Sequence, residues 1–279
     1  MGKSHVSKQA PSFDRINTAS CPNVATLLDT IEGTDGSFWI FIDDGPEFDK
    51  LSYLIEDRGQ KGEYFCEGEL AHIGLDMALG LAHLQLLGLA QRNVRPRAFF
   101  KQKGMYKVTD IALTPGGLDK TAIMFASPNS IQAPQNGFQL FREDAHALGR
   151  ILLLMMQVGG TEKPSKAPIM LGEFLETSMK HGYDKHKTHW KTLVEPYQYF
   201  CNNPSRDKYN KYILPLLENA RRCERYTEFF IQFIENLVAY EPNDRLDFFS
   251  IVRFFDNYRR WSGEVEASDF YLEESALSK

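Results

Sequence analysis

Apolar residues recur along this chain with two spacings, and each spacing predicts a different kind of element. Leu70, Ile73, Met77, Leu81 and Leu84 follow one another at steps of three and four residues. This spacing places the five side chains on one face of a helix, so it predicts a helix over residues 67–87 that ends near Gly88. Similar patterns predict further helices over residues 143–158, 171–179, 209–222, 226–240 and 247–260.

Short runs of β-branched and aromatic residues predict strands. Runs at residues 24–28 and 38–42 flank the turn segment 32–36, which indicates a hairpin, and a second pair at 98–100 and 105–108 flanks Lys103 and Gly104. A two-stranded hairpin is marginal alone in water, so the first pair requires cover from elsewhere. We therefore predict an α+β fold that is mainly helical with a few short strands.

Both ends of the chain are polar. Residues 1–22 contain two prolines and little periodicity, which predicts an N-terminal arm rather than a packed element. Residues 261–279 form an acidic tail, for which a solvated segment is the favoured interpretation over an acidic interaction peptide. The acidic residues of this tail are Glu264, Glu266, Asp269, Glu273 and Glu274.

The composition indicates a globular protein and disfavours several classes of function. The chain has 279 residues, of which 43% are hydrophobic and 25% charged, and its net charge is -5. These values exclude disorder of the whole chain. The acidic balance argues against nucleic acid as a partner. Because no apolar stretch has the length of a membrane span, we expect no membrane partner and a cytoplasmic protein, either in the cytosol or in the cytoskeleton.

Candidate metal ligands are few. Cys21, Cys66, Cys201 and Cys223 show no C-x-x-C spacing, so the sequence suggests neither a zinc site nor a disulfide framework. Three histidines occur in a basic stretch whose lysines would repel a dication, and a solvated loop is the favoured interpretation. These histidines are His181, His186 and His189.

A series of short motifs gives a more specific indication, and its members are Cys21–Val24, Phe38–Asp44, Leu81–Gly88, Gln91–Phe99, Val108–Ala112, Ala133–Gln135, Asp144–Gly149 and Glu241–Arg245. In order and spacing they resemble the C-terminal part of a protein kinase domain. Cys21–Val24 is similar to the H-P-N-I segment, Gln91–Phe99 to the catalytic loop H-R-D-L-K-P-x-N-I, and Ala133–Gln135 to A-P-E.

This resemblance implies a kinase-like domain over residues 23–260. A remnant small-lobe hairpin would occupy residues 23–44 and a helical large lobe residues 48–260, with an insertion at about 160–224. The segment before Cys21 is too short for the Gly-rich loop and the strand-three Lys of an active kinase, and no Gly-rich run occurs there.

The departures from the kinase pattern concern the residues that perform catalysis. Asn93 stands where active kinases have the Asp that accepts the substrate proton, and Ala98 where they have a magnesium-binding Asn. Asp110 remains at the metal-binding Asp position, but with its partners replaced a structural role is the favoured interpretation. The resemblance therefore implies a pseudokinase with no catalytic residues, no cofactor and no metal.

Residues that support the fold in kinases are largely retained. The resemblance implies that Asp144 hydrogen-bonds the catalytic-loop backbone and that Arg92 and Pro96 keep the shape of that loop. Arg245 normally pairs with the Glu of A-P-E, but that position is Gln135, so we expect at most a weaker neutral hydrogen bond there.

The leading functional hypothesis is an inactive kinase-like scaffold or structural subunit that binds protein partners in a larger assembly. One alternative is a divergent serine/threonine kinase with residual ATP-dependent phosphotransfer, and another is a module that binds phosphorylated or acidic peptides. A merely solvated basic edge is the simpler interpretation of the arginines and lysines in residues 91–107. The candidate partner-binding residues are Arg92, Arg95, Arg97, Lys101, Trp39 and Phe41.

Overall fold

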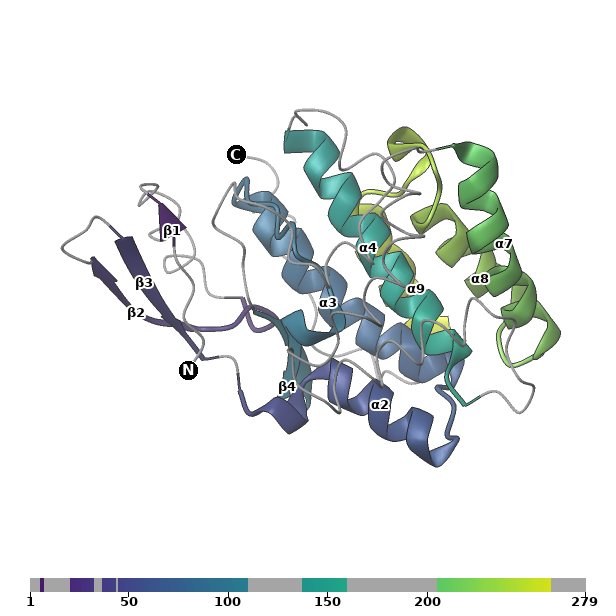
Figure 1. The fold of residues 1–279 in the computed structure, drawn as a ribbon, viewed down its shortest axis with the longest axis horizontal. Coiled ribbons are helices and arrows are strands. Elements are labelled where there is room, and N and C mark those ends of the chain that lie inside the picture. Colours follow the sequence, from purple (N-terminus) through teal and green to yellow (C-terminus); the bar gives the residue numbers. More distant parts are fainter. Residues whose placement is uncertain are drawn as a thin grey trace, which may run out of the picture.

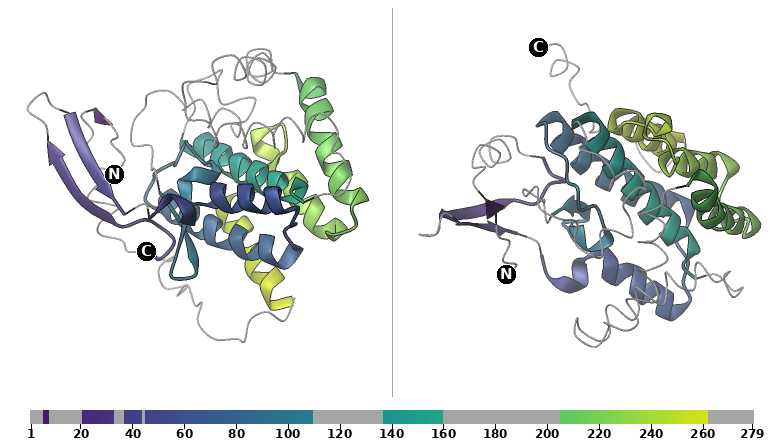
Figure 2. Two further views of the ribbon diagram at one scale, coloured as in Figure 1. Left: turned by 60° about the horizontal axis from the view of Figure 1, so that its bottom comes forward. Right: turned by 45° about the horizontal axis from the view of Figure 1, so that its top comes forward.

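The structure is a computed structural model, and it describes residues 6–7, 21–32, 37–43, 45–109, 137–159 and 205–261. These residues form a mainly helical body with two small antiparallel sheets, which confirms the predicted mixed and mostly helical class (Figure 1). The sheet with strand order β1-β3-β2 stands to one side of the helices, whereas β4 and β5 lie against the body (Figure 2).

The elements have the following bounds. The α-helices are α2 (Leu51–Lys61), α3 (Glu67–Leu86), α4 (Gly137–Gln157), α7 (Arg206–Arg222), α8 (Glu228–Leu237) and α9 (Phe248–Trp261). The strands are β1 (Val6–Ser7), β2 (Leu27–Glu32), β3 (Ser37–Ile42), β4 (Phe99–Gln102) and β5 (Met105–Val108). Short 3₁₀ helices are η1 (Glu47–Asp49), η2 (Pro96–Ala98) and η4 (Pro242–Asp244).

All five helices predicted within the described residues are present, and α2 is a further helix that was not predicted. Helix α3 ends as expected before Gly88, which has the positive φ of 72° that favours glycine. Helix α4 begins at Gly137 rather than at Glu143, because the half-buried Phe141 extends the apolar spacing of Ala145 and Leu148 toward the N-terminus. The helix predicted at residues 171–179 lies outside the described residues, as does most of the 160–224 segment.

The prediction of a first strand at residues 24–28 was wrong by several positions. Val24 forms a parallel bridge with Val108, and the N–H of Ala25 donates to the carbonyl of Val108 at 2.8 Å. These residues therefore pair with β5, and the hairpin strand β2 begins only at Leu27. The predicted hairpin itself is present, because β2 and β3 pair antiparallel.

The N-terminal segment contributes a strand, which the polar pattern did not predict. Val6 and Ser7 of β1 pair with Phe38 and Ser37 of β3. A part of the expected arm therefore covers one edge of β3 in cis.

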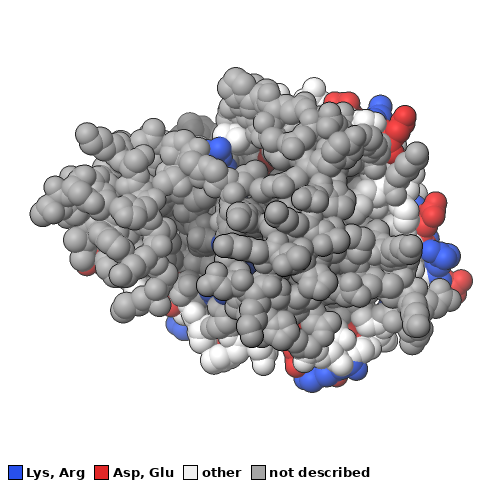
Figure 3. Space-filling view, viewed as in Figure 1, with Lys and Arg blue, Asp and Glu red and all other residues white. Residues whose placement is uncertain are grey.

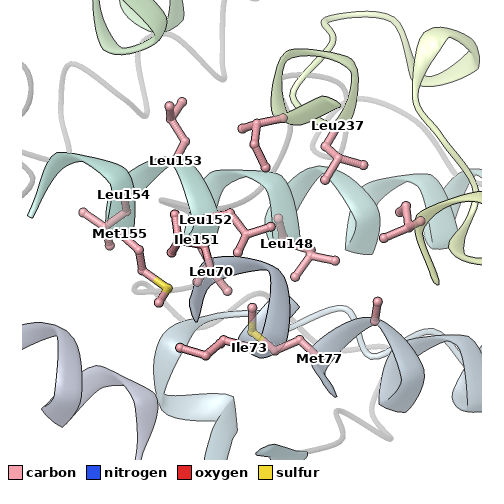
Figure 4. Packing of buried hydrophobic residues seen from close by; sticks show 14 of the residues in the cluster. Leu70, Ile73, Met77, Leu148, Ile151, Leu152, Leu153, Leu154, Met155 and Leu237 are labelled. Carbon is pink, nitrogen blue, oxygen red and sulfur yellow. The ribbon is translucent and has the colours of Figure 1, made fainter. Parts of the chain in front are cut away.

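The hydrophobic core lies between α3 and the helices beside it. Leu70, Ile73 and Met77 of α3 are buried and point toward Leu148 and Ile151 of α4 (Figure 4). Helices α8 and α9 pack against α4 and α3 respectively. This arrangement buries α3 on most of its surface.

A buried polar network attaches the segment before β2 to α3. The carboxylate of Asp76 accepts hydrogen bonds from the main-chain N–H of Tyr106 at 2.9 Å and from the Asn23 amide at 3.3 Å. Burial raises the pKa of Asp76, and the hydrogen bond from Tyr106 opposes this rise. The Asn23 amide also donates to the carbonyl of Tyr106 at 3.0 Å, so β5, α3 and the Cys21–Val24 segment are held together.

Within the described residues, no helix combines the length and hydropathy that a bilayer span requires.

The close approach of the Cys21–Val24 segment to α3 gives a first prediction. A Cβ at Gly80 would lie 2.5 Å from the carbonyl oxygen of Asn23 and 3.1 Å from Cγ1 of Val108. We expect Gly80→Ala to lower the free energy of unfolding by about 1–3 kcal/mol, because main chain must move, although Ala favours a helix. Urea unfolding followed by circular dichroism measures this change.

Gly59 in α2 provides a matched control, because a Cβ there meets no atom within 4 Å. Gly59→Ala should raise the free energy of unfolding by about 0.5–1 kcal/mol through helix propensity alone. Equal effects of the two substitutions would show that the contact between Gly80 and Asn23 does not constrain the fold.

Candidate functional site

The candidate site is the loop that joins α3 to β4, residues 91–98. It begins after the end of α3 and closes in the 3₁₀ helix η2, where the N–H of Ala98 donates to the carbonyl of Arg95 at 2.9 Å. Pro96 stands at the first turn of η2, where its fixed φ suits the helix start. The loop therefore lies between two rigid elements of the body.

Asp144 of α4 holds the beginning of this loop. Its Oδ2 accepts a hydrogen bond from the main-chain N–H of Gln91 at 2.7 Å, and its Oδ1 accepts one from the N–H of Arg92 at 2.8 Å. Arg92 has a φ of 60°, a left-handed conformation that costs about 1–2 kcal/mol for a non-glycine residue. Hydrogen bonds to a charged acceptor are among the stronger ones, so Asp144 offsets this cost.

The electrostatics of Asp144 reflect its burial. Only 4% of the residue is exposed, and burial raises the pKa of its carboxyl to about 7, against the opposing effect of the two N–H donors. The neighbouring Glu143 raises this pKa further. Near neutral pH the residue is therefore divided between its charged and neutral forms.

The Gln91 side chain fixes the interior of the loop. It is fully buried, and its Oε1 accepts from the main-chain N–H of Asn93 at 2.6 Å. Its Nε2 donates to the carbonyl of Thr109 at 3.2 Å. Gln91 thus ties the loop to the residue that precedes Asp110.

Ala98 makes a second connection to Thr109. Its side chain is fully buried, and its carbonyl accepts from the N–H of Thr109 at 2.8 Å. Asp110 lies outside the described residues. The main chain that leads to Asp110 is nevertheless fixed by Gln91 and Ala98.

Arg245 is held by an ion pair that the sequence did not predict. Its Nη1 lies 3.0 Å from Oε1 of Glu143, and its guanidinium also donates to the carbonyls of Ala239 and Tyr240 at 2.8 Å. Glu143 therefore supplies Arg245 with a carboxylate partner, and the expected neutral hydrogen bond between Arg245 and Gln135 stays a prediction. Gln135 lies outside the described residues.

The candidate partner-binding residues fall on two parts of the molecule. Arg92, Arg97 and Lys101 are exposed and Arg95 is half-buried, in one continuous segment from the loop into β4. Trp39 and Phe41 lie on β3, in the other sheet. The loop residues and Lys101 therefore belong to one part of the structure, and Trp39 and Phe41 belong to a separate sheet.

The other candidate ligands do not form a metal site in the part of the chain that the structure describes. No group of three or more His, Cys, Asp or Glu residues there is arranged to hold a metal ion. His181, His186 and His189 lie outside this part. Cys21, Cys66 and Cys223 are free thiols, and Cys201 is outside the described ranges.

Sequence reasoning missed Gln91, Glu143 and Asp76 as structural residues. A visible signal existed for Asp76, which directly precedes Met77 within the predicted apolar face of α3. A carboxylate at such a position must find hydrogen-bond donors. Gln91 and Glu143 carried no comparable signal, because their partners come from distant segments.

A scan against models of known protein families found no match, and a search of curated proteins also found none.

The raised pKa of Asp144 predicts a pH-dependent stability. The folded pKa of about 7 lies above the value of about 3.9 in an unfolded chain, so the folded state binds more protons between these values. Protonation of Asp144 therefore adds about 4 kcal/mol to the free energy of unfolding below about pH 4, and this addition is lost as the pH rises through 7. The ¹³C chemical shift of the Asp144 carboxyl, followed from pH 4 to 9, gives the midpoint.

Asp144→Asn removes this titration, so the stability difference between wild type and variant should decrease as the pH rises from about 4 to above 7. Ile151→Val is the matched control, because it removes a buried methylene group without a titratable group, at about 0.5–1.5 kcal/mol. Its effect should be the same at both ends of the range. A midpoint for Asp144 near the ordinary aspartate value would mean that the two N–H donors cancel the effect of burial, and would contradict this prediction.

Proposed function

We propose that this chain is a catalytically inactive, kinase-like protein that serves as a scaffold or structural subunit for protein partners. The observation that carries this proposal is a contrast within one loop. The backbone of residues 91–98 is held by buried Asp144 and Gln91, while the positions that would perform phosphoryl transfer carry Asn93 and Ala98.

Asn93 supports the proposal through its chemistry. A general base must accept a proton from the substrate hydroxyl, and such a step contributes about 10²–10⁴-fold to a rate. The amide of Asn93 does not accept a proton at neutral pH. The half-buried position of this residue does not change that property.

Ala98 supports the proposal through its burial. A magnesium ligand needs an oxygen that faces the metal, whereas the methyl group of Ala98 is fully buried in the core. The residues described around this loop therefore do not fit the metal that an active kinase binds there.

The fixed conformation of the loop at residues 91–98 favours a binding role over loss of all function. Positive φ at Arg92 and a buried carboxylate both carry an energetic cost, and such features persist where the surrounding structure compensates them. The loop presents the exposed Arg92 and Arg97, which can form bidentate contacts with carboxylates or phosphates. A partner with an acidic or phosphorylated segment is the chemistry that this surface fits.

The first test concerns nucleotide. A ligand at 100 times its Kd stabilises a protein by about 2.7 kcal/mol, which corresponds to a rise in Tm of about 5 °C for a protein of this size. We expect no such rise with ATP and magnesium, and none with ADP. Differential scanning fluorimetry measures it.

Assays of phosphate transfer from ATP complete this test. Wild type and Asp110→Ala should both fail to move labelled phosphate from ATP to a protein acceptor or to the chain itself. Transfer that disappears in Asp110→Ala would identify a divergent kinase and contradict the proposal.

The second test concerns partners. Charge reversal at the two exposed arginines, Arg92→Glu with Arg97→Glu, should reduce the capture of partner proteins by the tagged chain, because bidentate contacts are lost. Arg222→Glu is the control, because Arg222 is an exposed arginine at the end of α7. Quantitative mass spectrometry of the captured proteins compares the variants. Unchanged capture by the double variant would remove this loop from the binding surface.

A further inference from the structure

The lysines of the β4–β5 hairpin lack acidic partners among the described residues. Lys101 and Lys103 are exposed and Lys107 is half-buried, and no ion pair joins any of the three to a residue in the described ranges. Lys101 instead lies over the ring of Tyr106, 5.9 Å from its centroid. We call Lys101, Lys103 and Lys107 the basic hairpin surface.

Basic residues elsewhere on the described surface are commonly paired. Lys61 contacts Asp57 at 2.7 Å, and Arg260 contacts Asp256 at 2.8 Å. On the face shown in Figure 3, the blue groups at the right-hand edge lie beside red ones. The basic hairpin surface thus has no ion pair with the described residues. Carboxylates do lie near the hairpin, because Asp43 accepts a hydrogen bond from Gln102 at 3.0 Å and, in addition to burial, Glu69 and Asp49 raise the pKa of Tyr106.

An exposed aromatic residue lies between two acidic residues on an element that contacts this hairpin. Phe48 of η1 is 65% exposed, and η1 contacts β4. A binding segment that combines acidic and aromatic residues would match both features. Such a segment occurs in this chain after Trp261.

Residues 262–279 carry five acidic residues and one lysine, a net charge of -4. Phe270, Tyr271 and Leu272 stand between Asp269 and Glu273. The segment therefore complements the lysines in charge and Phe48 in apolar character. Its placement lies outside the described residues.

The segment begins close to the hairpin. Helix α9 ends at Trp261, and Arg259 of its last turn lies near enough to Asp76 to lower the pKa of that carboxyl. Asp76 in turn accepts a hydrogen bond from Tyr106 of β5. Both α9 and β5 contact α3, whose 20 residues span about 30 Å. Since 18 residues can extend over about 60 Å, the segment reaches the hairpin.

We propose that residues 262–279 bind the basic hairpin surface of the same chain. Each exposed ion pair contributes only about 0.2–1 kcal/mol, but covalent attachment holds the segment at an effective concentration of about millimolar. The contact is therefore reversible and weakened by salt. It goes beyond the proposed function, and an acidic partner would compete with it for the same lysines.

Zero-length carbodiimide cross-linking of the full chain tests this contact. The reagent joins a lysine to a carboxylate only where the two touch. Mass spectrometry of the monomer band should find acidic residues of 262–279 joined to Lys101, Lys103 or Lys107 in preference to Lys61, and high salt should remove these links. Links spread evenly over exposed lysines, or found only in a dimer band, would overturn the proposal.

Hydrogen exchange gives a second readout that needs no cross-linker. A variant with Glu264→Gln, Glu266→Gln, Asp269→Asn, Glu273→Gln and Glu274→Gln should exchange the amides of residues 99–108 about two- to fivefold faster than wild type at low salt. Amides of α4 serve as the internal control and should not change. Equal exchange in the hairpin of both proteins would overturn the proposal, whatever the nucleotide assays give.

Discussion

The structure depends on buried carboxylates that receive hydrogen bonds from segments distant in the sequence. Asp144 holds the loop after α3, and Asp76 holds β5 and the segment before β2. Glu67 at the start of α3 accepts from the main chain and hydroxyl of Thr227 and from the hydroxyl of Tyr258. Each carboxylate replaces water for main-chain groups that burial against α3 and α4 would otherwise leave unpaired.

This arrangement separates the shape of the loop from its chemistry. Its conformation is set by main-chain contacts to Asp144 and by the buried side chain of Gln91. Arg92 takes part in those contacts through its main-chain N–H, while Arg92 and Arg97 are exposed. The body can therefore keep the loop in one geometry while the side chains at its exposed positions change.

Local patterns were sufficient to predict α3, α4, α7, α8, α9 and the two hairpins, because helical spacing in α3 and the turn at Lys103–Gly104 are properties of neighbouring residues. Helix α2 was not predicted. They were insufficient where a partner comes from far along the chain. The local pattern places Val24 in a hairpin strand, but in the structure Val24 pairs with Val108 of β5. Likewise, the ion pair of Glu143 with Arg245 joins residues 102 positions apart, and no local pattern in the sequence indicates it.

The hydrogen bonds that Asp144 accepts from Gln91 and Arg92 come from main-chain N–H groups, which every residue except proline carries, so these bonds do not depend on the side chains at those positions. Substitutions at the exposed positions can therefore accumulate without refolding the body, as long as Arg92 or its replacement tolerates a positive φ. The surface of this loop can therefore change by mutation while the main-chain framework beneath it stays the same.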